Sequence, residues 1–187
     1  MKKVAVFCGS SDGAKNEYKE AAAELGKELV SRGVTLVYGG ASVGVMGALA
    51  DSVLEHGGEV IGVMPKFLEE REIAHQHVTE LVIVDNMHER KAKMAELADG
   101  FIVLPGGPGT MEEFFEIFTW AQIGLHQKPC GLLNIKGYYE PLIRLFDHMV
   151  EQEFLQERYR SLAMIEEEPE ALLNRFAHFK PVPIKTY

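Results

Sequence analysis

A glycine-rich segment followed by two carboxylates is the part of this chain best suited to chemistry. Residues 105–113 read PGGPGTMEE, between a short apolar run and a largely apolar helical run. Glycine lets a ligand approach the main chain closely, and a helix start offers free N–H groups and a favourable dipole to an anion. The segment therefore predicts either a cradle for one phosphate or a tight turn without a ligand. Its candidate phosphate-binding residues are Gly106, Gly107, Gly109 and Thr110.

The carboxylate of Glu113 has two interpretations. Thr110 and Glu113 have the spacing of a capping box, in which Thr110 caps a helix and Glu113 binds back to its first N–H. Alternatively, Glu113 is a carboxylate at the mouth of an anion site, where it acts as a base or stabilises positive charge. The two interpretations are compatible, because a cap can hold a carboxylate in place, and both stay open from the residues alone.

Two adjacent cations, Arg90 and Lys91, fall in the first turn of the preceding predicted helix, for which Asn86 is a plausible N-cap. Positive charge at that position opposes the helix dipole unless an anion or a carboxylate lies nearby. Met87 shares a helical face with both cations. One strand separates this helix start from the glycine-rich segment, so we expect both at the same edge of a sheet. The alternative is a solvated basic pair.

A second glycine-rich segment, residues 39–47, follows an earlier apolar run. Gly40 and Gly44 of this segment, with Ser10 of the turn at residues 9–11, are candidates for the other wall of a ligand crevice. The alternative is close packing of a helix against a strand, which requires glycine for the same steric reason. The sequence favours neither.

These segments require a fold that brings several strand ends together. Short apolar runs alternate with helical runs along the chain, which predicts an α/β fold with a doubly wound, mostly parallel sheet of about seven strands and helices on both faces. Ligands bind beyond the carboxyl ends of such strands. Residues 66–79 are expected to form a short helix or a lid-like loop. We expect strands at 4–8, 35–38, 60–64, 80–84, 100–104, 129–135 and 162–165. We expect helices at 16–32, from the end of the 39–47 turn to about residue 56, and at 87–98, 110–126, 138–152 and 169–179.

Length and composition narrow the class of protein. A chain of 187 residues predicts a single domain, residues 1–187, and a net charge of −9 disfavours a nucleic-acid or membrane surface. The two cysteines, Cys8 and Cys130, fit neither a disulfide framework nor a metal-ligand spacing. His75 and His77 lack a third ligand, so a surface loop is expected there rather than a metal site. Without a signal peptide or a bilayer-length apolar run, we expect a cytoplasmic protein.

The helical run at residues 111–125 is apolar nearly all round. Such a helix is either enclosed in the core or part of a subunit interface, and a symmetric dimer is the commonest assembly. The sequence therefore predicts a homodimer through this helix.

Taken together, the motifs resemble the LONELY GUY family of cytokinin riboside 5′-monophosphate phosphoribohydrolases, over nearly the whole chain up to about residue 165. The residues that carry the resemblance are Phe-Cys-Gly-Ser10, Gly-Gly-x-x-x-Gly-x-Met-Gly47, Met87-x-x-Arg90-Lys91, Pro105-Gly-Gly-x-Gly-Thr-x-x-Glu113, Thr119-Trp-Ala-Gln-x-Gly-x-His126-x-Lys-Pro129 and Asn134-x-x-Gly-Tyr-Tyr139.

The resemblance implies a Rossmann-like homodimer that hydrolyses the N-glycosidic bond of an adenosine-type 5′-monophosphate, without a metal or other cofactor. It implies that Arg90 and Glu113 are the catalytic pair and that residues 107–110 hold the phosphate. The further substrate contacts that it implies are Glu72, Lys91 and Thr119. The base is expected to contact Met87 and residues 66–79.

Other functions remain alternatives at this point. The same fold without turnover would be a nucleotide carrier or sensor. A nicotinamide-dependent enzyme is disfavoured, because the Gly-x-Gly-x-x-Gly fingerprint is missing, as is the Lys-Ser/Thr of a Walker loop. Members of the resembling family have also been called lysine decarboxylases, and no pyridoxal-phosphate lysine context supports that activity.

Overall fold

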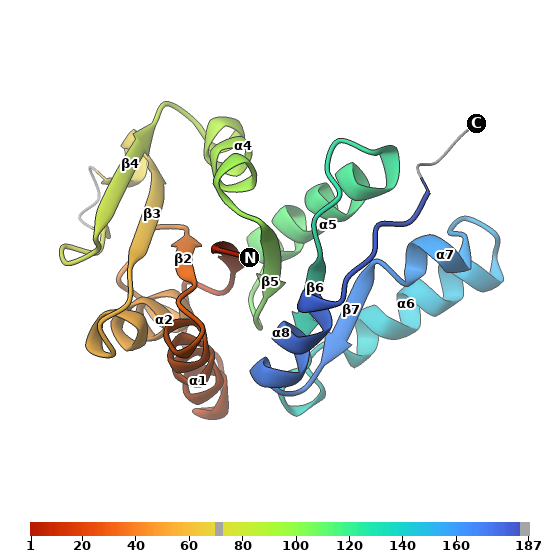
Figure 1. The fold of residues 1–187 in the computed structure, drawn as a ribbon, viewed down its shortest axis with the longest axis horizontal. Coiled ribbons are helices and arrows are strands. Elements are labelled where there is room, and N and C mark those ends of the chain that lie inside the picture. The colour runs from red at the N-terminus through yellow and green to blue at the C-terminus, as the bar shows by residue number, and fades with distance from the viewer. Residues whose placement is uncertain (70–72, 184–187) are drawn as a thin grey trace.

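The computed structural model describes residues 1–69 and 73–183, and its strands form one parallel sheet (Figure 1). The sheet has seven strands in the order β4-β3-β2-β1-β5-β6-β7, and all six pairings are parallel. The strand order reverses between β1 and β5, so this is a doubly wound α/β sheet, as predicted. The strands are β1 (Lys3–Phe7), β2 (Thr35–Tyr38), β3 (Val60–Pro65), β4 (Glu80–Val84), β5 (Gly100–Val103), β6 (Cys130–Leu133) and β7 (Ala163–Glu166).

Helices cover both faces of this sheet, because alternate residues of the central strands point to opposite sides. On β1, Val4 and Val6 belong to one apolar cluster with α1, α2 and α8, whereas Ala5 and Phe7 belong to another with α4, α5 and α6. Both clusters consist of buried apolar side chains, which explains why these strands are continuous apolar runs. The helices are α1 (Glu17–Ser31), α2 (Gly44–Glu55), α3 (Lys66–Glu69), α4 (Met87–Leu97), α5 (Pro108–Ile123), α6 (Glu140–Glu151), α7 (Glu157–Arg160) and α8 (Pro169–Ala177), with a 3₁₀ turn, η1 (Ile135–Gly137).

Much of the apolar surface of α5 is buried within the chain. Phe114 and Phe118 are buried against the sheet, and their rings lie 6.0 and 5.0 Å from the ring of Phe146 on α6. Burying each of these rings contributes on the order of 2 kcal/mol, which fixes α5 firmly on β1 and β5. Ile123 and Leu125 at the end of the helix stay exposed.

Of the two alternatives predicted for residues 66–79, the short helix is confirmed at the start of the segment, where α3 (Lys66–Glu69) forms a single helical turn. After residue 72 the chain pairs with the second glycine-rich segment: Ala74 bridges Ala41, and the amide of His75 donates to the Gly40 carbonyl at 2.8 Å. The expectation of a surface loop is wrong for His75, which is buried, with its Nε2 3.0 Å from Asp51 Oδ1.

The remaining differences from prediction lie at element ends. The helix expected from residue 138 begins at Glu140, after the 3₁₀ turn, because Pro141 suits the first turn of a helix. The short helix α7 was not predicted, since four residues show no periodicity. No helix within residues 1–69 and 73–183 is long and apolar enough to cross a bilayer.

Candidate active site

A cavity of about 580 Å³ lies at the carboxyl ends of the central strands, where the strand order reverses. This volume is that of a small-molecule site. Turns that follow β1, β2 and β5 form its walls, together with the start of α4 and the start of α5. Of the predicted site residues, those that line it are Ser10, Met87, Arg90, Gly106, Gly107, Gly109, Thr110 and Glu113.

The glycine-rich segment that was predicted as a phosphate cradle or a tight turn is not built as a capping box. Helix α5 begins at Pro108, two residues earlier than expected, because proline is pre-organised for the first position of a helix. Gly107 is the N-cap, and no side chain caps the helix. Thr110 is therefore inside the helix, and the predicted capping box with Glu113 is wrong. The first amides of α5 stay available to an anion in the cavity.

Two tyrosines hold this cradle in place, and neither was predicted as a site residue. The hydroxyl of Tyr138 donates to the Gly106 carbonyl, and that of Tyr139 to the Leu104 carbonyl, each at 2.6 Å. The amide of Gly9 donates to the Pro105 carbonyl at 3.1 Å, which ties the cradle to the turn after β1. The tyrosines follow β6 on the same sheet edge, and that position is the signal that could have found them.

The second glycine-rich segment has a packing role. The first amides of α2 are already satisfied, because Val45 donates to the Ser11 carbonyl at 3.3 Å and Met46 to the Gly9 carbonyl at 3.2 Å. Gly44 has a φ of +65°, and a Cβ there would lie 2.3 Å from the backbone of Ser10. In contrast, a Cβ at Gly107 or Gly109 would meet no atom within 4 Å among the described residues.

Gly40 and Gly44 accordingly lie outside the cavity lining, and a φ of +81° together with contact to Met64 explains glycine at position 40. Gly39, which was not among the predicted contacts, has a more direct role. A Cβ at Gly39 would lie 1.8 Å from Arg90 Nη2, so glycine is what admits the guanidinium.

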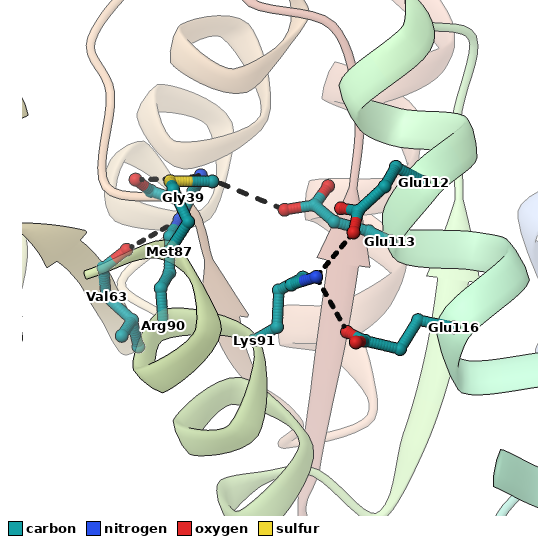
Figure 2. A network of polar contacts seen from close by, with 8 residues as sticks. All are labelled: Gly39, Val63, Met87, Arg90, Lys91, Glu112, Glu113 and Glu116. Atoms are coloured by element: carbon teal, nitrogen blue, oxygen red, sulfur yellow. Dashed lines mark hydrogen bonds and ion pairs between the residues drawn. The ribbon is translucent and has the colours of Figure 1, made fainter.

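Arg90 is anchored by backbone carbonyls and faces Glu113 across the cavity (Figure 2). Its Nε donates to the Val63 carbonyl at 3.1 Å and its Nη2 to the Gly39 carbonyl at 3.3 Å. Its Nη1 lies 3.8 Å from Glu113 Oε1. The side chains of Arg90 and Glu113 are 9% and 10% exposed. The predicted N-cap Asn86 is confirmed, because its Oδ1 accepts from the amide of Glu89 at 3.0 Å.

Burial of Glu113 raises the pKa of its carboxyl group to about 7. The charge of Arg90 lowers this pKa, but at 3.8 Å it does not outweigh the loss of hydration. A carboxyl group that titrates near neutral pH beside a cavity is suited to proton transfer as well as to charge stabilisation.

Lys91 turns away from the cavity, toward the outer side of α5 (Figure 2). Its Nζ lies 2.5 Å from Glu112 Oε1 and 3.1 Å from Glu116 Oε2, and its side chain is 5% exposed. Thr119 is exposed on α5 and also lies outside the cavity lining. Glu72 lies outside the described residues. The structure therefore does not bring Lys91 or Thr119 to the cavity of a single chain.

The other end of the cavity is apolar. Besides Met87, side chains from the start of α2, from β3 and from the 66–79 segment line it: Met46, Met64, Leu68 and Ile73. Methionine packs adaptably and its sulfur contacts aromatic rings favourably, so this wall suits a flat apolar group such as a purine base. Single methionines carry no motif, and the expectation that the base contacts Met87 and residues 66–79 is what pointed to this wall.

The fold and the cavity define a Rossmann-like α/β protein with a charged crevice at the switch point of its sheet. The model of the family described as "possible lysine decarboxylase" matches residues 46–176. The chain is 49% identical over 181 residues to a probable cytokinin riboside 5′-monophosphate phosphoribohydrolase from Oryza sativa subsp. japonica, covering 97% of this chain and 72% of the relative. It is 48% identical to the cytokinin riboside 5′-monophosphate phosphoribohydrolase of Arabidopsis thaliana, covering 97% and 85%. The chain belongs to this family, the LONELY GUY family.

Solved structures support the fold at lower sequence identity. The molybdenum cofactor binding protein from the phototrophic bacterium Rippkaea orientalis superposes with a TM-score of 0.72 at 20% identity, covering 95% of this chain and 96% of that chain. The molybdenum cofactor carrier protein from Chlamydomonas reinhardtii gives a TM-score of 0.70 at 19% identity, covering 95% and 99%. These likenesses show the fold alone.

Proposed function

We propose that this protein hydrolyses the N-glycosidic bond of an adenosine-type nucleoside 5′-monophosphate, releasing the free base and ribose 5-phosphate. The phosphoribohydrolase names of relatives near 49% identity support this reaction. The structural observation that carries the proposal is the buried pair of Arg90 and Glu113, which faces the cavity directly beside an open glycine cradle.

The cradle holds the 5′-phosphate, and the apolar wall with Met87 receives the base. This orientation leaves the ribose between the two ends, next to Glu113. Fixing the phosphate supplies binding energy away from the reacting bond and holds the sugar for attack.

In the reaction the C1′–N bond breaks and its electron pair leaves with the base, so that positive charge develops on the ribose. The carboxylate of Glu113 stabilises this charge, and it orients a water molecule and accepts its proton. The hydroxide so formed bonds to C1′. The departing base takes up a proton from the solvent, to which Glu113 then releases the proton that it accepted. Arg90 binds phosphate or sugar oxygens while its remaining N–H groups stay on the backbone carbonyls of Gly39 and Val63.

We propose that the protein is cytoplasmic. We also propose that it is a homodimer formed through residues 111–125, because Ile123 and Leu125 of this segment are exposed at 42% and 67%. Of the substrate contacts that the resemblance implies, Glu72 and Thr119 remain predictions, and Thr119 is on the same helix. Lys91 contacts Glu112 and Glu116 instead of lining the cavity of its own chain. Light scattering at micromolar concentration is expected to give the mass of a dimer, and a monomer mass would contradict this assembly.

Product analysis tests the proposed reaction. Purified protein is incubated with AMP, with an N6-prenylated AMP and with the two corresponding nucleosides, and chromatography measures free base and ribose 5-phosphate. We expect equal amounts of both products from the monophosphates and little product from the nucleosides, because these lack the group that the cradle holds. Monophosphates that bind but stay intact would favour the carrier alternative.

A further inference from the structure

The two adjacent cations of α4 face different surroundings. Arg90 lines the cavity, whereas Lys91 is turned toward α5 and does not line it (Figure 2). The Lys91 ammonium lies 2.5 Å from Glu112 and 3.1 Å from Glu116, one helical turn apart on α5. Its side chain is 5% exposed, so it has no open path to a ligand in the cavity of its own chain.

The surroundings of Lys91 hold more negative than positive charge. Three carboxylates of α5, on Glu112, Glu113 and Glu116, face the two cations of α4. The Oε2 atom of Glu116 is buried and accepts no well-aligned hydrogen bond from the described residues, so the nearby ammonium of Lys91 is the group that neutralises it. Without Lys91, two uncompensated carboxylates would flank Glu113.

We propose that Lys91 is a positioning residue for the catalytic carboxylate: by holding Glu112 and Glu116 it limits the negative potential at Glu113, so that a larger fraction of Glu113 is ionised at neutral pH. This inference rests on the proposed function and gives Lys91 a role other than the substrate contact that the resemblance implies. The geometry also keeps α4 against α5, and a mere tether between the helices is the competing explanation.

The charged groups around Glu113 determine the sign of the effect. Burial raises the pKa of its carboxyl group most, followed by the opposing effect of Arg90. Glu112 and Glu116 raise this pKa and Lys91 lowers it. On the third side, from the turn after β1, the buried thiol of Cys8 stays protonated because its own pKa is raised by burial and by Glu113. Removing Lys91 alone therefore raises the pKa of Glu113.

The first experiment measures kcat/KM for AMP from pH 5.5 to 9 in wild type, Lys91→Met, Lys91→Arg and the double variant Lys91→Met/Glu116→Gln. The matched control is Lys93→Met, which removes a half-exposed cation of the same helix that pairs with Glu96 at 3.0 Å. A phosphate group titrates near pH 6 in every variant alike, so only differences between the profiles are interpreted.

We expect the acidic limb of Lys91→Met to move up by about one pH unit, which lowers kcat/KM about tenfold at pH 6.5 and less than about twofold at pH 9. Lys91→Arg and the charge-compensated double variant are expected to stay close to wild type. A loss of kcat/KM of equal size at every pH, or a double variant as impaired as Lys91→Met, would show that Lys91 only holds α4 against α5. Either result would overturn the inference. If Lys91→Met fails to fold, Glu116→Gln alone must move the limb down, and an unmoved limb overturns the inference.

A second readout does not require turnover. Carboxyl ¹³C NMR follows the titration of Glu113, whose signal is identified by its absence in Glu113→Gln. Its midpoint is expected near pH 7 in wild type and about one unit higher in Lys91→Met. An unchanged midpoint contradicts the role of Lys91. A wild-type protein that binds AMP without cleaving it contradicts only the proposed function.

Discussion

Two charged regions lie side by side between α4 and α5, and they differ in how completely their charges are paired. Lys91 lies 2.5 and 3.1 Å from two carboxylates and is enclosed by them. Arg90 Nη1 lies 3.8 Å from Glu113 and also donates to the Met87 sulfur, while its Nε and Nη2 bind backbone carbonyls. Both cations are buried to a similar extent, with side-chain exposures of 5% and 9%.

The difference shows how one pair of helices can hold both a structural and a reactive charge cluster. In the closed cluster of Lys91, Glu112 and Glu116, short contacts offset the cost of burial. In the open pair of Arg90 and Glu113, the arginine is held back by the carbonyls of Gly39 and Val63, so the carboxylate stays incompletely paired beside the cavity. The open pair is therefore the region in which a change should affect turnover most.

The largest expected effect comes from neutralising the carboxylate of the open pair. Glu113→Gln is expected to lower kcat/KM for AMP about a thousandfold, because it removes the group that stabilises positive charge and accepts the proton. Glu116→Gln, one turn further along α5 in the closed cluster, is expected to cost less than about fivefold at pH 8. Steady-state assays of both variants compare the two regions directly. Losses of similar size would contradict the difference between the open pair and the closed cluster.

Exchanging the cations should also distinguish the two regions, with a smaller loss in kcat/KM than Glu113→Gln gives. Arg90→Lys keeps the charge but loses the planar guanidinium, which binds two carbonyls with two of its nitrogens while the third faces Glu113. We therefore expect about a hundredfold loss in kcat/KM. The reverse exchange in the closed cluster, Lys91→Arg, keeps a cation between two carboxylates and should cost little. Equal tolerance of both exchanges would mean that only charge matters in the open pair.

The smallest expected effect is on stability, and its sign is opposite to that on activity. The folded-state pKa of Glu113, about 7, lies above the ordinary value of 4.5 for a glutamate carboxyl group. The stability associated with this raised pKa is therefore fully present below pH 4.5 and is lost as pH rises through 7. Between pH 5 and 8 wild type should lose about 2 kcal/mol that Glu113→Gln retains.

Urea unfolding of both proteins at pH 5 and pH 8 measures this difference. The matched variant Glu116→Gln keeps Glu113 but lowers its pKa, so it is expected to lose stability over this range as wild type does, by a smaller amount. A Glu113→Gln protein that loses as much stability as wild type would mean that Glu113 is ionised throughout this range.

The fold could be predicted from the sequence because the pattern of apolar runs is local. The strands Thr35–Tyr38 and Glu80–Val84 have their predicted bounds, and the others differ by one or two residues at their ends. The edge of the sheet on which the site lies was also predictable, since the glycine-rich turn and the start of α4 both follow parallel strands. The helix start at Pro108 was missed because Thr110 offered an equally good capping pattern.

What the sequence could not provide was the direction of each side chain and the reason for each glycine. Arg90 and Lys91 are neighbours, and only the rotation of α4 decides which of them faces the cavity. The two glycine-rich segments have similar composition, yet Gly47 is required by the carbonyl of Ser42, from which its Cβ would be 2.3 Å, whereas Gly107 faces open space. Such contacts join residues that no spacing rule connects.

The most direct test of the open pair measures binding and turnover of AMP by Glu113→Gln in the same sample. Calorimetry gives the affinity, and chromatography of the recovered solution gives the products. We expect AMP to bind to this variant at least as tightly as ribose 5-phosphate binds to wild type. We also expect AMP to be recovered intact after a time in which wild type converts it completely. Free adenine and ribose 5-phosphate formed at the wild-type rate would contradict the assignment of Glu113 as the catalytic carboxylate.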